Sequence, residues 1–237
     1  MNISYYPAQS RGGADYDWLK TNYSFSFAYY MNPRRMGFGP LRVLNDDWIA
    51  ANSGFPPHSH ANMEIITIPF SGTLSHKDSS GGEGTVAAGE VQLMSAGTGI
   101  THSEYNTSLD TPVTLFQIWV EPNQMNVAPR YEEKDFEFSK VNNTIKPFIT
   151  PTGENDTFQI YQDAYFSWAH ISSKQNLEYS LHTESHGLFA IVIDGQGSID
   201  HQTLYPRDAV EIRHSSSALL QSNTSMRVLL IEVPIQG

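Results

Sequence analysis

The amino-acid sequence predicts an all-β protein built from two β-barrels in tandem. Three observations support this fold class. Apolar and small residues come in short runs, turn-forming residues separate these runs at regular intervals, and no stretch of the first half has a convincing helical period. The second half resumes the same pattern, as expected for a β-sandwich or barrel that occurs twice.

The composition limits the kinds of partner. The chain has 237 residues, enough for one large domain or two of ordinary size. Its 25 acidic and 14 basic residues give a formal charge of -11, which disfavours binding to nucleic acids or anionic membranes. The absence of cysteine excludes disulfides, thiolate metal sites and cysteine nucleophiles. Residues 1–7 lack the features of a signal peptide and no apolar run is long enough to span a membrane, so we expect a cytoplasmic protein.

The first half is predicted to contain eight short strands. Residues 24–30 alternate aromatic and small side chains, which favours a strand, and residues 41–47 form another. Gly and Pro interrupt residues 33–40 so often that we expect a loop there. The remaining strands are predicted at residues 64–70, 73–78, 84–88, 91–96, 100–106 and 113–120.

A polar, charged segment at residues 121–146 is predicted to connect the two halves. We therefore divide the chain into an N-terminal barrel at residues 1–130 and a C-terminal barrel at residues 131–237. Strands of the second barrel are predicted at residues 157–161, 164–169, 178–181, 188–193, 197–201, 209–212, 218–221 and 226–233.

Three histidines and a carboxylate come in two short bursts in the first half. His58 and His60 stand two residues apart, and so do His102 and Glu104. Side chains two apart on an extended strand point to the same face, so each pair can face the interior of one barrel. If the two strands lie side by side, the pairs converge. The bursts therefore predict a metal site assembled by a β-fold.

The two halves align as a weak internal repeat. Residues 65–74 match residues 190–199, and residues 89–93 match residues 207–211. In this alignment His58 and His60 correspond to Thr183 and Ser185, whereas His102 and Glu104 correspond to Leu220 and Ser222. Because none of these four residues is a histidine or a carboxylate, the second copy is predicted to bind no metal. The nearby histidines His182, His186, His201 and His214 fall out of register and are predicted to lie at the surface or line a pocket.

An ordered set of motifs within residues 10–122 resembles the pirin family. These motifs are Pro57-His58-Ser59-His60, Met63-Glu64-Ile65, Leu74-Ser75-His76-Lys77-Asp78-Ser79, the segment 89–100 that begins Gly89-Glu90-Val91, His102-Ser103-Glu104, and the N-terminal segments 25–30 and 36–43. The set is specific in its order and spacing. Residues 59–62 depart from the commonest pirin pattern, which has a more basic turn.

The resemblance implies a bicupin, with two cupin barrels of the jelly-roll type in tandem. It implies one mononuclear metal, held in the N-terminal barrel by the residues matching His58, His60, His102 and Glu104. Glu64 matches a ligand position of many single-barrel cupins, but the resemblance assigns it an outer hydrogen bond instead. The second half is too diverged for any residue to be carried over.

Three imidazoles and one carboxylate suit one divalent transition metal per chain with exchangeable positions open. Fe(II) is our first expectation, and the ligand types also admit Ni, Mn, Co, Cu or Zn. The resemblance implies a quercetin 2,3-dioxygenase-like oxidoreductase that uses O2 to open the heterocycle of a flavonol, with Glu104 as both ligand and base for the substrate hydroxyl. The alternative is a regulatory protein in which the metal's redox state alters a surface for a protein partner. A third interpretation is a metal retained for stability.

Two other motifs carry no function. Ser103 lies between two site residues, but strand neighbours point to opposite faces and no nucleophile elbow surrounds it, so we discount a hydrolase. Residues 81–84 are rich in glycine but lack the lysine and following helix of a phosphate loop. They are predicted to form a hairpin turn.

Overall fold

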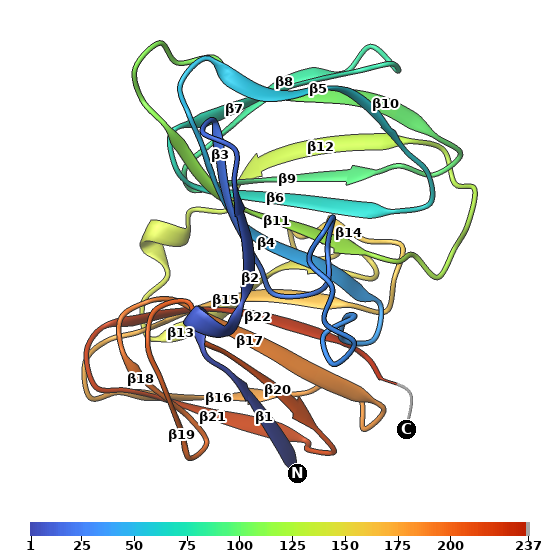
Figure 1. The fold of residues 1–237 in the computed structure, drawn as a ribbon. Helices are drawn as coiled ribbons and strands as arrows, with labels where there is room; N and C mark the ends of the chain where they lie inside the picture. The colour runs from blue at the N-terminus through green and yellow to red at the C-terminus, as the bar shows by residue number, and fades with distance from the viewer. Residues whose placement is uncertain (236–237) are drawn as a thin grey trace. The chain divides into compact units, whose positions relative to one another are not determined.

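The computed structural model describes residues 1–235 and confirms the all-β fold class (Figure 1). Within these residues, the only helices are two 3-10 turns, η1 (Ala8–Ser10) and η2 (Phe138–Lys140). None of the described helices is long and apolar enough to cross a membrane. The strands form two compact units, each with a seven-stranded and a four-stranded sheet.

The first unit, here called the N-terminal barrel, contains residues 12–37 and 41–137. Its larger sheet has the order β12-β9-β6-β11-β4-β3-β2, and its smaller sheet has the order β5-β10-β7-β8. The strands are β2 (Gly12–Asp15), β3 (Leu19–Tyr23), β4 (Leu41–Ile49), β5 (Ser53–His60), β6 (Glu64–Ser71), β7 (Thr73–Asp78), β8 (Glu83–Ala87), β9 (Glu90–Ser95), β10 (Ile100–Asn106), β11 (Val113–Val120) and β12 (Arg130–Asp135).

The second unit, the C-terminal barrel, contains residues 1–11, 38–40 and the chain from residue 138 onward. Its sheets have the orders β1-β20-β17-β22-β15-β13-β14 and β16-β21-β18-β19. The strands are β1 (Asn2–Tyr6), β13 (Thr144–Thr150), β14 (Phe158–Gln159), β15 (Tyr165–Ile171), β16 (Asn176–Ser180), β17 (His186–Asp194), β18 (Gly197–Ile199), β19 (Gln202–Leu204), β20 (Ala209–Arg213), β21 (Ser217–Ser222) and β22 (Met226–Pro234).

The strand orders support the predicted internal repeat. β6 and β17 occupy the same place in their larger sheets, as do β9 and β20. At the edge next to β9 and β20, however, the two barrels use strands from different parts of the chain. β12 occupies that edge in the N-terminal barrel, whereas the N-terminal strand β1 occupies it in the C-terminal barrel, with Ile3 opposite Ile212. These two units do not decide the predicted domain boundary between residues 130 and 131, which remains a prediction.

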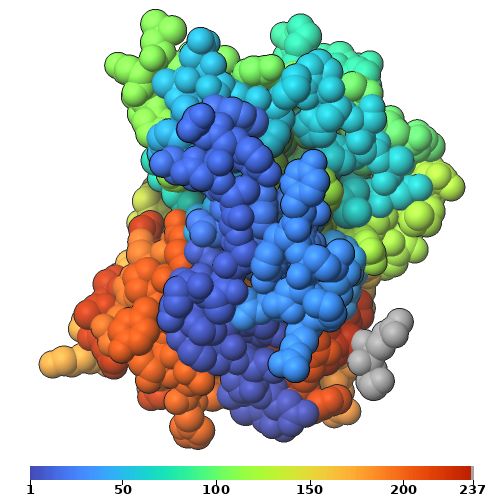
Figure 2. Space-filling model, in the orientation of Figure 1, coloured from blue at the N-terminus to red at the C-terminus, as the bar shows by residue number. Residues whose placement is uncertain are grey.

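Several strands have the predicted bounds, and others do not. β7, β10 and β11 begin and end at the predicted residues. The prediction of a strand at residues 24–30 is wrong: this segment forms a turn with a single bridge between Phe27 and Tyr30, and Ala28 has φ of 51°. The segment belongs to the blue part of the surface in Figure 2. β12 lies inside the stretch that was predicted as a connection. The sequence did not predict this strand, because its polar side chains give no apolar alternation.

The two barrels differ in what fills them. The C-terminal barrel has an apolar cluster that includes Leu188, Val210, Leu220 and Leu230 and draws on both of its sheets. The N-terminal barrel has separate apolar clusters around Leu74 and Ile65. Its buried residues also include a polar set that comes from β6, β7, β9, β10 and β11 and marks a candidate functional site. This set contains Thr67, His76, Gln92, His102, Glu104 and Gln117.

Candidate metal centre

The two predicted histidine and carboxylate pairs lie on adjacent antiparallel strands. β5 carries His58 and His60, β10 carries His102 and Glu104, and His58 pairs with His102 in the register. Burial alternates along β10, so His102 and Glu104 face the interior while Ser103 faces the other side. The register between β5 and β10 shifts between His102 and Glu104, so that His102 lies opposite His58 and Glu104 lies opposite Phe55.

The three histidines converge on one point. The ring centroids of His58 and His102 are 4.4 Å apart, those of His60 and His102 are 5.0 Å apart, and those of His58 and His60 are 4.9 Å apart. One nitrogen from each ring lies within 4.8 Å of the others. Trp119 packs against His60 in a T-shaped contact, with ring centroids 4.9 Å apart, and thereby limits the movement of that ring.

A hydrogen bond at Nδ1 of His58 leaves Nε2 of the same ring free to bind a metal. Its Nδ1 lies 2.9 Å from the backbone carbonyl oxygen of Pro56, which only accepts, so Nδ1 carries the proton and Nε2 keeps its lone pair. The prolines before His58 are compatible with β5 because β5 is the edge strand of its sheet.

A hydrogen-bonded chain from Asp78 through His76 orients His102. His76 Nε2 lies 2.9 Å from Asp78 Oδ2, and His76 Nδ1 lies 3.4 Å from His102 Nδ1. The carboxylate only accepts, so His76 donates through Nε2 and accepts through Nδ1 from His102. His102 therefore keeps its lone pair on Nε2, a buried atom without a hydrogen-bond partner among the described residues. An orphaned imidazole nitrogen beside two other histidines fits a metal ion.

Asp78 and His76 are themselves held in place. Asp78 Oδ1 accepts hydrogen bonds from the backbone and side chain of Ser80 and from the backbone of Gly82, in the turn between β7 and β8. The hairpin turn predicted at residues 81–84 lies partly there, but its last two residues begin β8. The ring of Tyr131 stacks on His76 with centroids 4.2 Å apart. β12, which carries Tyr131, therefore supports the site although it holds none of its predicted ligands.

Glu104 is 2% exposed and is positioned by two amides. Gln117 Nε2 donates to Oε2 at 2.9 Å, and Gln92 Nε2 donates to Oε1 at 3.4 Å. Burial raises the pKa of Glu104, while the nearby His76 and His58 and the two amides oppose this rise. Glu104 also forms a possible ligand group with His102 and His76, whose donor atoms lie within 4.8 Å of one another.

Two of the central histidines, His60 and His102, are held neutral. Burial lowers the pKa of His60 to about 4, and the neighbouring His58 contributes. Burial also lowers the pKa of His102 to about 3, with further contributions from the surrounding histidines. Both imidazoles are therefore unprotonated at neutral pH, the state that binds metal.

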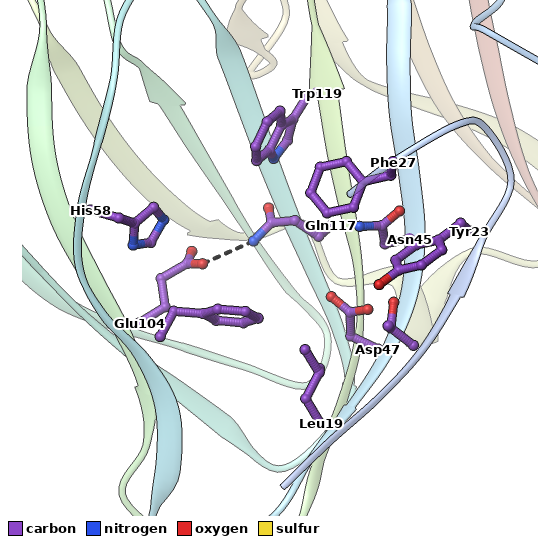
Figure 3. A pocket seen from close by; sticks show the side chains of 11 residues that line it. Leu19, Tyr23, Phe27, Asn45, Asp47, His58, Glu104, Gln117 and Trp119 are labelled. Carbon is purple, nitrogen blue, oxygen red and sulfur yellow. Dashed lines mark hydrogen bonds between the residues drawn. The ribbon is translucent and has the colours of Figure 1, made fainter. Parts of the chain in front are cut away.

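A cavity of about 180 Å³ opens beside this cluster. Figure 3 shows His58 and Glu104 on one side of the cavity, and Tyr23, Asn45 and Asp47 on the other. Aromatic side chains supply much of the wall, including Phe27 from the surface turn and Phe55 from β5. The full lining is Leu19, Thr21, Tyr23, Phe27, Asn45, Asp47, Phe55, His58, Glu104, Gln117 and Trp119.

Comparison with known proteins shows which family the chain belongs to. The family profile for pirin matches residues 6–120, and a profile described as the quercetinase C-terminal cupin domain matches residues 148–233. A quercetin 2,3-dioxygenase of Escherichia coli K12 is 36% identical over 228 residues, which cover 96% of each chain. The chain belongs to the pirin family. A pirin-like protein of Caulobacter vibrioides is also 36% identical, over 95% of this chain and 97% of its own.

Solved structures agree with this assignment. The crystal structure of the bacterial pirin YhhW from Escherichia coli in complex with nickel(II) matches with a TM-score of 0.94 and 34% sequence identity, covering 99% of this chain and 100% of that chain. The predicted pirin resemblance and the two cupin domains are thus confirmed.

Two site residues of this pirin-family chain had no predicted role. His76 and Asp78 lie in the predicted strand 73–78, two residues apart, and β7 pairs with β10 so that Glu104 faces His76 and His102 faces Asp78. Their spacing is the same signal that marked the predicted ligands. Gln92 and Gln117 gave no such signal, because a single amide in a strand is most often a solvated side chain.

Glu64 and the C-terminal histidines take other positions. Glu64 is buried on β6 and accepts a hydrogen bond from Ser95 Oγ at 2.9 Å. His182, His201 and His214 are exposed, as predicted. His186 does not lie at the surface, because this residue is 1% exposed and bonds the buried carboxylate of Glu232. A lone histidine before an apolar strand did not reveal its acidic partners.

In the C-terminal barrel, two leucines, a tyrosine and a serine occupy the positions of the four predicted ligands. β16 and β21 pair as β5 and β10 do, and Leu177 lies opposite Leu220 where His58 lies opposite His102. Tyr179 then takes the place of His60, and Ser222 that of Glu104. The predicted alignment of His58 and His60 with Thr183 and Ser185 is therefore out of register, because these two residues follow β16 instead of lying within it.

The Asp78–His76–His102 chain yields a prediction about metal affinity. We expect His76→Phe to keep the stack on Tyr131 but to weaken metal binding about 10-fold to 100-fold, because His102 loses the acceptor that selects its tautomer. Competition with a chelator for Ni(II) would measure this affinity. Ser75→Ala, on the neighbouring β7 residue, is the matched control. Unchanged affinity would contradict the orienting role, and complete loss of metal would identify His76 as a ligand.

Proposed function

We propose that this protein is a metal-dependent dioxygenase of the quercetinase type, which opens the heterocycle of a flavonol with O2. One observation carries the proposal: three converging histidines and a buried glutamate adjoin an aromatic-walled cavity. A structural metal would be enclosed by its ligands, whereas a catalytic one keeps access to a substrate. The relative named quercetin 2,3-dioxygenase, 36% identical over nearly the whole chain, supports the same reaction.

We propose His58, His60, His102 and Glu104 as the ligands of one divalent transition metal, with Fe(II) as the first choice and Ni, Mn, Co, Cu or Zn as alternatives. Such an ion would supply a Lewis-acidic, open site for the hydroxyl and keto oxygens of the substrate and for O2. The neutral histidines leave it a net positive charge. The apolar and hydroxyl side chains Leu177, Tyr179, Leu220 and Ser222 support the prediction that the C-terminal barrel binds none.

Glu104 is the residue proposed to move the proton. A flavonol hydroxyl coordinates well only after it loses its proton, and Glu104 is the carboxylate that lines the cavity beside His58. The amides of Gln92 and Gln117 hold the two carboxylate oxygens, which fixes the direction of the remaining lone pairs. Phe27, Phe55 and Trp119 exclude water around an aromatic ring.

Metal reconstitution and oxygen uptake test this function. Metal-free protein would be loaded separately with each of the six ions, analysed for metal content, and assayed for oxygen consumption on addition of quercetin. We expect about one metal per chain and turnover with at least one ion. Two metals per chain would contradict the metal-free C-terminal barrel. Absence of turnover with every ion would contradict the dioxygenase and favour the regulatory protein that binds a protein partner.

A further inference from the structure

The wall of the cavity opposite His58 contains two buried polar side chains that the proposed metal chemistry does not use. Asn45 and Asp47 are each 5% exposed and lie two residues apart on β4, so both point into the N-terminal barrel. Among residues 1–235, neither Asn45 Oδ1 nor Asp47 Oδ1 has a hydrogen-bond partner. Both residues line the cavity (Figure 3).

Unpartnered buried groups of this kind are costly, and most proteins avoid them. The cost is evident at Asp47, where burial raises the pKa to about 7 and the Thr21 hydroxyl only partly opposes the rise. A carboxyl that lowers stability in the free protein is explained if a ligand supplies the missing hydrogen bonds. The indole Nε1 of Trp119 and the hydroxyl of Thr21 are two further buried groups without a partner among the described residues of this cavity.

The cavity has room for one aromatic ring. A cavity of roughly 150 Å³ accommodates benzene, and this cavity measures about 180 Å³. Phe27 and Phe55 line it, while Asn45 and Asp47 lie across from His58 and Glu104. A ring whose one edge faces the metal ligands therefore presents its opposite edge to the two polar side chains.

We propose that Asn45 and Asp47 form a hydroxyl-recognition subsite, which selects aromatic substrates carrying hydroxyl groups on the edge away from the metal centre. Asp47 accepts a hydrogen bond from such a hydroxyl, and the Asn45 amide can accept or donate. The indole N–H of Trp119 donates to a ligand oxygen. The substrate class is thus a polyhydroxylated aromatic compound rather than any aromatic hydroxyketone. This subsite rests on the proposed function and adds the source of its specificity.

Binding without turnover tests the subsite. Protein loaded with Zn(II) and kept free of O2 would be titrated with quercetin and with 3-hydroxyflavone, which keeps the adjacent hydroxyl and keto oxygens but lacks the other hydroxyls. We expect the parent to prefer quercetin by about 10-fold to 100-fold, the range for a hydrogen bond to a charged acceptor. Asp47→Asn should remove most of this preference and leave the affinity for 3-hydroxyflavone unchanged, and Asn45→Ala is the second variant.

Asp46→Asn is the matched control, because Asp46 is the next residue on β4 and points to the opposite face. Asp47→Asn is expected to fold. The Asp47 carboxyl of the parent loses its proton at a higher pH in the folded state than in the unfolded state, so it lowers the free energy of unfolding as pH rises towards 7. Above pH 7, Asp47→Asn should therefore unfold at a higher temperature than the parent.

The outcomes separate this inference from the proposed reaction. Equal affinities of the parent for the two flavonols, or an equal loss of both in Asp47→Asn, would overturn the subsite while leaving the dioxygenase intact. A preference for quercetin that disappears in Asp47→Asn, in a protein without turnover, would support the subsite and contradict the dioxygenase. A parent that binds neither flavonol would overturn both.

Discussion

Replacing Glu104 with glutamine is expected to lower quercetin-dependent oxygen uptake by about 100-fold or more, the range typical for loss of a general base. Glutamine keeps the shape of the side chain and an oxygen that can still lie near His102, so some metal remains bound. It cannot take the proton of the substrate hydroxyl. Metal content and oxygen consumption would be measured on the same preparations, so that each rate is expressed per bound metal.

Glu64→Gln is the matched control for this prediction. Glu64 is a similarly buried glutamate of the same barrel, but it accepts a hydrogen bond from the Ser95 hydroxyl and is not one of the proposed metal ligands. We expect a milder effect, on the order of 10-fold to 100-fold in affinity or activity. If turnover follows metal occupancy alone across the variants, Glu104 is not the base. If Glu64→Gln removes the metal and Glu104→Gln keeps it, Glu64 is the ligand.

Replacing Glu232 with leucine is expected to reduce the free energy of unfolding by about 3 to 5 kcal/mol, because several buried hydrogen-bond donors lose their acceptor and each costs about 1 to 3 kcal/mol. The Glu232 side chain is fully buried on β22, and its two oxygens accept four hydrogen bonds, which uses all of its acceptor sites. The donors are Tyr179 Oη, the backbone and Nδ1 of His182, and Nδ1 of His186, at 2.7 to 2.8 Å.

His186 explains why the loss should be large. Its Nδ1 faces Glu232, and its Nε2 lies 3.1 Å from Asp163 Oδ2. Glu232→Leu therefore leaves the buried Nδ1 of His186 without its hydrogen-bond partner, and an unsatisfied buried polar group costs stability. The ring of His182 also stacks on Tyr165 with centroids 3.6 Å apart, so loss of Glu232 releases a second anchored side chain.

Calorimetric unfolding would measure the effect, with Asp194→Asn as the control. Asp194 forms an ion pair with Arg227 in the same barrel, but both side chains are more than 40% exposed, so its removal should cost about 1 kcal/mol or less. The metal content of the folded Glu232→Leu protein should equal that of the parent. A stability change as small as that of the control would show that the Glu232 network is not a stabilising centre.

The local pattern of the sequence determined the class of the fold and the predicted ligands. Period-two alternation depends only on neighbouring residues, which is why β7, β10 and β11 were predicted with their observed bounds. The spacing of two residues within each pair, His58 with His60 and His102 with Glu104, placed each pair on one face for the same reason.

The edge strands and the surroundings of the site were decided by tertiary structure. β1 and β12 are polar or partly exposed edge strands whose identity depends on distant partners, β20 and β9, and distant pairing leaves no local period. The orientation of His102 by His76 depends on the register between β7 and β10.

The cavity and the Glu232 network show the same division. Asn45 and Asp47 lie within a strand that the sequence predicted, yet only the folded barrel places them across from His58. Glu232, His186 and Asp163 meet across sequence separations of 23 to 46 residues. Strand type is encoded by neighbours along the chain, whereas hydrogen-bond partners are selected by the register between strands, and only the assembled sheets determine that register.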